Sequence, residues 1–115
     1  MSLTALFIIE SSPHQSARAV EGLRIAAGVG AWQKVRAEVF LGEAALELLS
    51  TESDFPLDDA AEEWLHIITQ GARPILVPGT FQVGDQQLRA GCVVQRLSDA
   101  ELAGIAARSK FLLRF

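Results

Sequence analysis

An apolar run, followed at once by turn residues and then by a helical pattern, constrains the fold of this chain most. LTALFIIE (3–10) has the length of a strand and is rich in β-branched and aromatic residues. SSPHQS (11–16) consists of turn formers, and residues 17–32 have helical spacing. A strand buried on both faces that leads directly into a helix is typical of a parallel α/β sheet. Ligands bind such sheets at the carboxyl ends of the strands, so we expect a site at the loop 11–16.

The rest of the chain continues this alternation. The patterns predict further strands at 35–42, 73–79, 92–97 and 109–115, and further helices at 43–50, 58–70 and 98–108. Residues 80–91 fit either a loop with a short helix at 85–89 or a hairpin. Alternating strands and helices imply right-handed crossovers and a parallel sheet. We therefore predict a single doubly wound α/β domain over residues 1–115, with about five mainly parallel strands and helices on both faces.

Composition and charge limit the cellular environments and binding partners that we expect for this protein. The formal net charge is −4 and the Lys and Arg residues are scattered along the sequence, so neither nucleic acid nor a membrane is an expected partner. No apolar run approaches the ~20 residues of a membrane span. Residues 1–10 also lack the basic segment of a signal peptide, and we expect a cytoplasmic protein. The mean hydropathy of +0.25 is high for a domain this small, which predicts apolar surface beyond the core and hence an oligomer.

Several catalytic and cofactor motifs are missing from the sequence. Nothing matches the phosphate-binding pattern G-x-x-x-x-G-K-[ST], the dinucleotide pattern G-x-G-x-x-G after the first strand, or the hydrolase pattern G-x-S-x-G. His66 has no metal-binding residue one helical turn later, and we expect it at a helix surface. The sequence predicts no cofactor and no metal.

Polar residues at the expected site are candidates for ligand binding. His14 can act as an acid or base, or help to hold an anion at the start of the following helix. Ser11, Ser12 and Ser16 would add hydroxyls to the same place. Glu43 opens a predicted helix at the same edge of the sheet, where it could pair with His14. The alternative is structural, because serines suit a turn and an acidic residue suits a helix N-terminus.

Three segments resemble the DsrE/DsrF-like sulfur-relay proteins, which include the TusC and TusD types. The segments are SSPHQSARAVEGLRIA, VFLGEAALELL and SDAELAGIAARSKFLLRF. The best matching positions are Pro13, Ala17 to Ala19, Gly22–Leu23, Ala26 and Val39 to Gly42. The resemblance covers most of the chain. It implies a small parallel α/β domain that assembles into homo-oligomers or with related DsrE-like subunits.

The resemblance also identifies a position where sulfur chemistry would occur. In some members a cysteine at the end of the third strand carries a persulfide, and this chain has Pro78 at that place. The chain is therefore more similar to a TusC/DsrF-type subunit that is not the carrier. Such a subunit would act as a scaffold, bind a partner, or bind a small ligand near His14. A generic small-ligand-binding α/β module is an alternative, and whether the protein is an enzyme is open.

Cys92 offers a second alternative, because it is the single cysteine of the chain. With one cysteine, the chain can form neither an intrachain disulfide nor a cysteine-based metal site. A sulfurtransferase could use Cys92 as its catalytic persulfide carrier if the thiol were accessible and its pKa lowered. Otherwise Cys92 is a small buried hydrophobe, as Gly91 before it and Val93–Val94 after it suggest. By alignment with the family, Cys92 also lies at the amino end of a strand, away from the usual edge for a site.

Overall fold

One sheet of parallel strands forms the centre of the protein. The structure, a computed structural model, describes residues 3–50, 57–70, 73–82, 88–89 and 91–115. The strands are β1 (Leu3–Ile9), β2 (Val35–Leu41), β3 (Ile75–Pro78), β4 (Val94–Leu97) and β5 (Phe111–Arg114). They form a 5-stranded sheet in the order β4-β3-β2-β1-β5, and every pairing between neighbours is parallel. The predicted fold class is confirmed.

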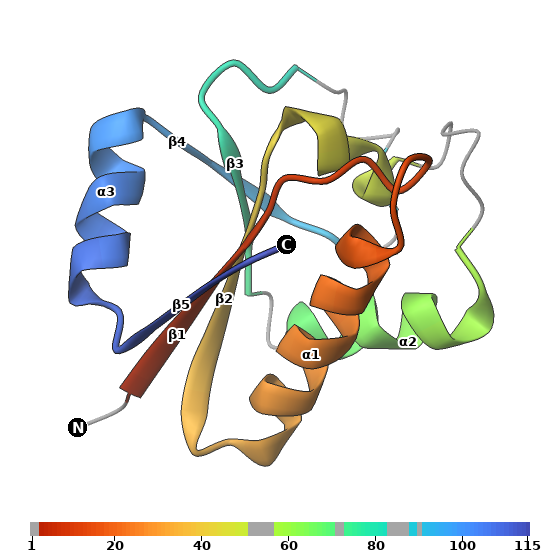
Figure 1. The fold of residues 1–115 in the computed structure, drawn as a ribbon, viewed down its shortest axis with the longest axis horizontal. Coiled ribbons are helices and arrows are strands. Elements are labelled where there is room, and N and C mark those ends of the chain that lie inside the picture. The colour runs from red at the N-terminus through yellow and green to blue at the C-terminus, as the bar shows by residue number, and fades with distance from the viewer. Residues whose placement is uncertain (1–2, 51–56, 71–72, 83–87, 90) are drawn as a thin grey trace.

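The helices cover both faces of the sheet, and the strand order explains which helix covers which face. The helical elements are α1 (Arg18–Trp32), the 3-10 helix η1 (Glu43–Leu49), α2 (Asp59–Ile68) and α3 (Asp99–Arg108). The chain moves in one direction from β1 through β2 to β3, and right-handed crossovers therefore place α1 and α2 on the same face. It returns from β4 to β5 in the opposite direction, which places α3 on the other face (Figure 1).

Alternating side chains of β1 belong to two hydrophobic cores. Phe7 and Ile9 pack in the larger core with α1, η1 and α2. Leu6 and Ile8 pack in the smaller core, where α3 contributes partly buried side chains. The neighbouring strand follows the same alternation, because Phe40 faces the smaller core. All four of the named β1 side chains are at most 4% exposed, and burial of each contributes about 1.5–3 kcal/mol.

Some elements differ in length from the sequence predictions. β4 begins at Val94 rather than at residue 92, although the Val93 carbonyl already accepts a hydrogen bond from the Ile75 N–H at 2.8 Å. Gly91 has a φ of +82°, a left-handed conformation that interrupts an extended strand just before Cys92. Residues 83–87 lie outside the described part of the chain, so the two interpretations of 80–91 stay open.

The start of α3 matches its sequence motif in detail. Ser98 Oγ accepts a hydrogen bond from the Glu101 N–H at 3.1 Å, and the Glu101 carboxylate accepts one from the Ser98 N–H at 2.9 Å. The hydrogen bond from the Ser98 N–H to the carboxylate, together with the Ser98 hydroxyl, lowers the pKa of Glu101 below its ordinary value. The capping box therefore fixes where the helix begins after β4.

Two glycines of α1 provide a matched test of this packing. A Cβ at Gly28 would meet nothing within 4 Å, whereas one at Gly22 would lie 3.0 Å from Ile9 and Phe115. We expect Gly28→Ala to raise the free energy of unfolding by about 0.5–1 kcal/mol, because alanine favours the helix. Gly22→Ala should gain less than this or lose stability. Urea denaturation measures both, and an equal gain in the two variants would contradict the close contact at Gly22.

Candidate functional site

Segments far apart in the sequence meet at the carboxyl edge of the sheet. Because the strands are parallel, the loop after β1, the helix η1 after β2 and the turn after β3 all lie at this edge. They lie together at the top of Figure 1. This is the edge at which the sequence predicted a site.

A cavity of about 330 Å³ opens between η1 and the segment after β3. Its described lining combines carboxylates, hydroxyls, an amide and apolar side chains: Glu43, Leu46, Glu47, Ser50, Thr80, Phe81 and Gln82. A pocket of this size, with a few polar groups on an apolar wall, suits a small molecule or a short segment of a partner. We call it the carboxyl-edge cavity.

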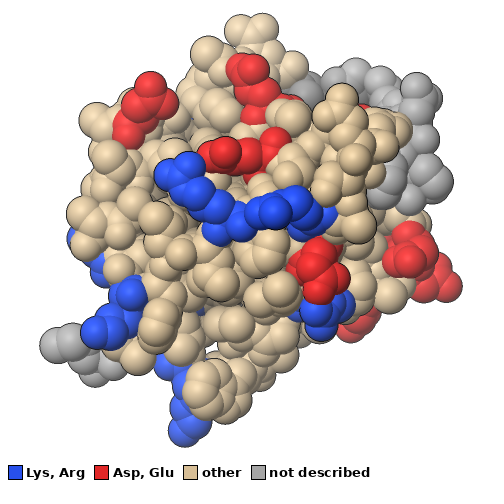
Figure 2. Space-filling view, viewed as in Figure 1, with Lys and Arg blue, Asp and Glu red and all other residues tan. Residues whose placement is uncertain are grey.

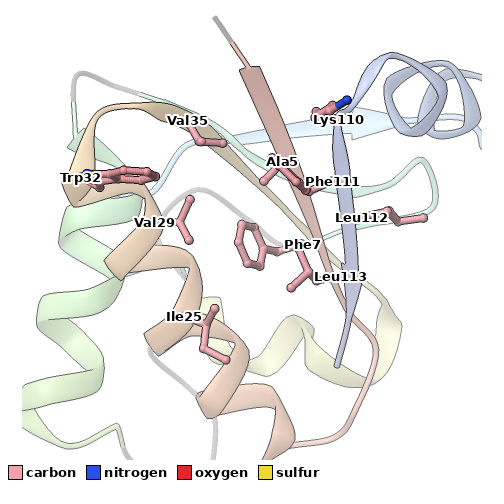
Figure 3. Close-up of a pocket in the computed structure, with 10 residues that line it drawn as sticks. All are labelled: Ala5, Phe7, Ile25, Val29, Trp32, Val35, Lys110, Phe111, Leu112 and Leu113. Atoms are coloured by element: carbon pink, nitrogen blue, oxygen red, sulfur yellow. The ribbon is translucent and has the colours of Figure 1, made fainter.

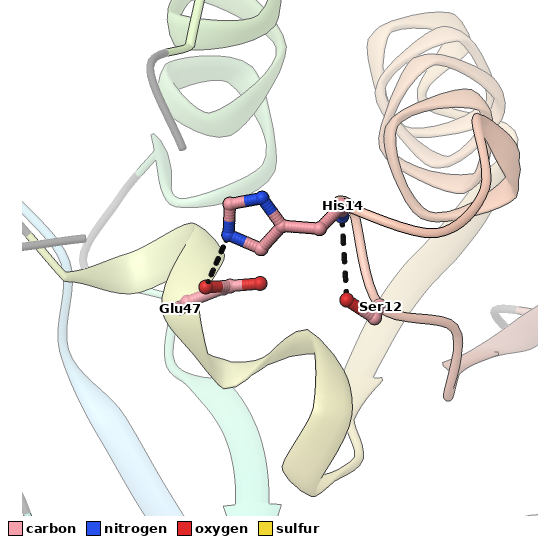
Figure 4. A network of polar contacts seen from close by, with 3 residues as sticks. All are labelled: Ser12, His14 and Glu47. Atoms are coloured by element: carbon pink, nitrogen blue, oxygen red, sulfur yellow. Dashed lines mark hydrogen bonds and ion pairs between the residues drawn. The ribbon is translucent and has the colours of Figure 1, made fainter. Parts of the chain in front are cut away.

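His14 bonds to one wall of this cavity. Its Nε2 lies 2.9 Å from the Glu47 carboxylate, and its backbone N–H donates to Ser12 Oγ at 3.3 Å (Figure 4). The side chains of His14 and Glu47 are 45% and 30% exposed, respectively, so solvent reaches both. A pair this exposed contributes at most about 1 kcal/mol to stability. The contact therefore orients the imidazole more than it stabilises the fold.

The carboxylate at hydrogen-bond distance from His14 is thus Glu47, which the sequence analysis did not single out. Glu43, the residue considered there, instead accepts a hydrogen bond from the Thr80 hydroxyl at 3.4 Å. Thr80 and Phe81 were also missed, because residues 80–91 have no clear periodicity. The sequence signal that could have identified Glu47 was the predicted helix itself, which carries Glu47 four residues after Glu43 at the predicted edge.

The three candidate serines lie in the loop as predicted, and hydrogen bonds show what each does locally. Ser11 donates its N–H to the Phe115 carbonyl at 3.3 Å. Ser12 Oγ holds the His14 backbone, and Ser16 Oγ accepts from the Arg18 N–H at 3.1 Å, at the start of α1. These bonds shape the turn and the helix start, as short hydroxyl side chains commonly do. Ligand binding by these serines stays a prediction.

The turn after β3 forms a firm wall of the cavity. The Phe81 N–H donates to the Pro78 carbonyl at 3.0 Å, and the Phe81 side chain is only 4% exposed. Arg96 donates from Nε to the Phe81 carbonyl at 2.8 Å, and its guanidinium lies 5.7 Å from the centre of the Phe81 ring. Such a cation–π contact adds a modest stabilisation. Pro78, the last residue of β3, thus stands beside the cavity where the family resemblance would place a cysteine.

Cys92 lies at the other end of the sheet, before β4. Its N–H donates to the Arg89 carbonyl at 3.1 Å, and its side chain packs, partly buried, against the larger core. Burial raises the pKa of the Cys92 thiol, and the charge of Arg89 only partly opposes this. A raised pKa leaves less thiolate at neutral pH, and the thiolate is the nucleophile.

Among the described residues, no three or more His, Cys, Asp and Glu side chains form a group that could hold a metal ion. His66 is exposed on α2, as expected. Within the ranges that the structure describes, no helix has the length and apolarity to cross a membrane.

Alkylation of Cys92 tests whether burial makes its thiol less reactive. We expect iodoacetamide to modify the folded protein more slowly than the urea-unfolded chain at the same pH, because burial raises the pKa and limits access. As pH rises, the rate should level off at a higher pH in the folded protein than in the unfolded one. The opposite order of the two midpoints would contradict the raised pKa.

Comparison with known proteins supports the fold. No family model matches the chain, and no curated protein matches it by sequence. Among solved structures, the crystal structure of the YchN protein from E. coli is similar over 100% of both chains, with a TM-score of 0.73 and 18% sequence identity. At this identity the likeness shows the fold alone. The chain therefore has the α/β fold of YchN.

Proposed function

We propose that this protein is a DsrE/DsrF-like subunit of a sulfur-relay type system that does not itself carry the sulfur. One observation carries the proposal: Pro78, which has no thiol, ends β3 beside the carboxyl-edge cavity. The single cysteine precedes the amino end of β4 and has a raised pKa. The DsrE-like fold agrees with the family resemblance. The role left for such a subunit is to bind a partner or a small ligand.

The chemistry of the carboxyl-edge cavity suggests what it would bind. Glu43 and Glu47 offer carboxylate oxygens, which accept hydrogen bonds and attract positive charge. His14 holds Glu47 from outside the cavity wall. The apolar contribution comes from Leu46 and Phe81. A ligand or partner loop with an amine or hydroxyl group on an apolar body fits this combination.

We further propose that the subunit assembles in the cytoplasm with copies of itself or with related DsrE-like subunits. A mean hydropathy of +0.25 is high for a chain of this size. Several large apolar side chains are also exposed, which is common on surfaces that bind other molecules.

A persulfide-transfer experiment tests the non-carrier role. The folded protein is incubated with inorganic polysulfide, freed of excess reagent and analysed by mass spectrometry. We expect no retained sulfur on Cys92, because partial burial limits access to its thiol and raises the pKa, so that less thiolate forms than in the unfolded chain. The urea-unfolded chain, in which the same thiol is exposed, provides the positive control.

The same experiment decides the alternative, in which Cys92 is the catalytic thiol of a sulfurtransferase. That alternative is favoured by the partial exposure of Cys92 and by the nearby positive charge of Arg89. Gain of one sulfur atom by the folded protein, and its loss in Cys92→Ala, would refute the non-carrier role.

Ligand retention tests the carboxyl-edge cavity separately. We expect native mass spectra of the protein purified from cells to show a bound small molecule or partner, and His14→Ala to reduce its occupancy several-fold. The physical reason is that Glu47 loses the group that orients its carboxylate. His66→Ala, an exposed histidine on α2, is the matched control. Equal occupancy in the two variants would show that His14 has no part in binding.

A further inference from the structure

Four of the five large apolar side chains that are exposed in the described part of the chain lie at one end of the molecule. Leu3 begins β1, Trp32 ends α1, and Phe111 and Leu112 begin β5. Because the strands are parallel and α1 runs back against them, these element ends meet at the amino end of the sheet, at the lower left and bottom of Figure 1. Trp32 is 65% exposed, and the other three are between 42% and 47% exposed. Apolar surface gathered in this way indicates a binding surface.

These side chains lie on both sides of the sheet. Trp32 and Phe111 face each other across an apolar groove of about 490 Å³ between α1 and β5, and Lys110 also belongs to its lining (Figure 3). Leu112 lies on the other side of β5, away from this groove. The whole amino end of the sheet, and not one of its faces, is therefore partly apolar.

Four cations are gathered at the same end, although they are scattered along the sequence. Lys34 and Arg36 lie at the start of β2, Arg108 ends α3, and Lys110 precedes β5. The sheet brings two of them close, because the Lys110 N–H donates to the Thr4 carbonyl at 2.8 Å and Thr4 pairs with Arg36 on its other side. Arg36 and Arg108 line one small cavity of about 140 Å³. The four cations thus surround the apolar side chains.

Carboxylates are concentrated elsewhere in the molecule. Glu38 is the acidic residue of β2, and its carboxylate pairs with Arg36 Nε at 3.2 Å. The N-termini of α2 and α3 lie at the carboxyl end of the sheet, and their first turns carry acidic residues such as Asp59 and Glu101. Figure 2 accordingly shows Lys and Arg at the lower left and bottom of the molecule, and Asp and Glu at its top and right. The amino end is therefore positive although the chain has a net charge of −4.

We infer that this amino-end surface, formed by the four apolar side chains and the four cations around them, binds an anionic phospholipid membrane. The aromatic and aliphatic side chains enter the headgroup region, where apolar area removed from water contributes to binding. The long Lys and Arg side chains extend past them to the lipid phosphates. Attraction between these cations and the anionic surface adds to the apolar contribution and orients the domain.

The mixture of side chains selects a lipid surface over a protein partner. The core of a protein interface is depleted of charged residues, and of lysine in particular. Here Lys34 lies two residues from Trp32, and Lys110 immediately precedes Phe111. Aromatic side chains interspersed with Lys and Arg are typical of surfaces that lie on a membrane. A helix dipole accounts for a cation at the end of α3, but it gives no reason for exposed apolar side chains beside it.

The amino-end surface lies at the opposite end of β1 and β2 from the loops that carry the carboxyl-edge cavity. The inference therefore goes beyond the proposed function and does not depend on it, and the two can fail independently. It assigns the exposed side chains of this end to lipid, so assembly with other subunits would use a different face.

Co-sedimentation with lipid vesicles tests the inference. We expect the protein to bind vesicles made of equal amounts of phosphatidylglycerol and phosphatidylcholine. Vesicles of phosphatidylcholine alone should bind it about tenfold more weakly or less, because each cation near an anionic surface contributes about a fivefold gain in affinity. Added salt should weaken binding to the anionic vesicles. In a Trp64→Phe background, the fluorescence of Trp32 should shift to shorter wavelength as its ring leaves water.

Two pairs of matched substitutions locate the surface. Lys110→Gln should weaken binding to the anionic vesicles about fivefold, whereas Arg114→Gln, which removes the same charge at the other end of β5, should leave it unchanged. Phe111→Ser should weaken binding about tenfold or more, because its ring no longer leaves water. Val93→Ser, at an exposed apolar residue before β4, should not. Thermal unfolding confirms that each variant is folded.

Three results would overturn the inference. The first is equal binding to the two kinds of vesicle, or equal effects of Lys110→Gln and Arg114→Gln. The second is an oligomer, seen by light scattering without lipid, that Phe111→Ser dissociates, since the surface would then be an interface between copies of the chain. The third is binding of polyglutamate by a protein that binds neither kind of vesicle, since the occupant would then be an acidic protein.

Discussion

Parallel pairing between β1 and β2 is the interaction on which the rest of the structure depends. The ladder runs without interruption from Leu3 with Val35 to Ile9 with Leu41. It presents one set of side chains to α1 and the other to the side covered by α3. Because the side-chain period of a strand is two, a shift of the pairing by one residue would exchange these sets. This register therefore determines both cores. It also determines where the loop after β1 and the helix η1 after β2 lie at the carboxyl edge.

The topology also leaves two regions of the surface that could bind other molecules. At the carboxyl edge, the end of each strand delivers a different segment, and His14 meets Glu47 across 33 positions of sequence. At the β5 edge, the same crossovers leave apolar side chains such as Phe111 without a covering helix. The first region combines carboxylates with hydroxyls, and the second is almost wholly apolar. Their different chemistry argues for different occupants.

The end of β3 illustrates that a residue, and not the fold, decides what chemistry a position can perform. The residue there is Pro78, which has no thiol. Proline has no nucleophile and no N–H, but it ends the strand and starts the turn that carries Phe81. The position therefore keeps a structural role. Function must be argued from the residues of the site, because the fold alone does not determine it.

The sequence by itself determined the alternation of strands and helices, the two-faced burial of β1 and the capping box at Ser98. These depend on local periodicity and on side chains a few residues apart, and the structure confirms them. Only the tertiary structure decided that Glu47 meets His14 and that Trp32 and Phe111 face each other across a groove. Such pairs are set by strand order and by the hand of the crossovers, which bring distant segments together and leave no trace in the local pattern.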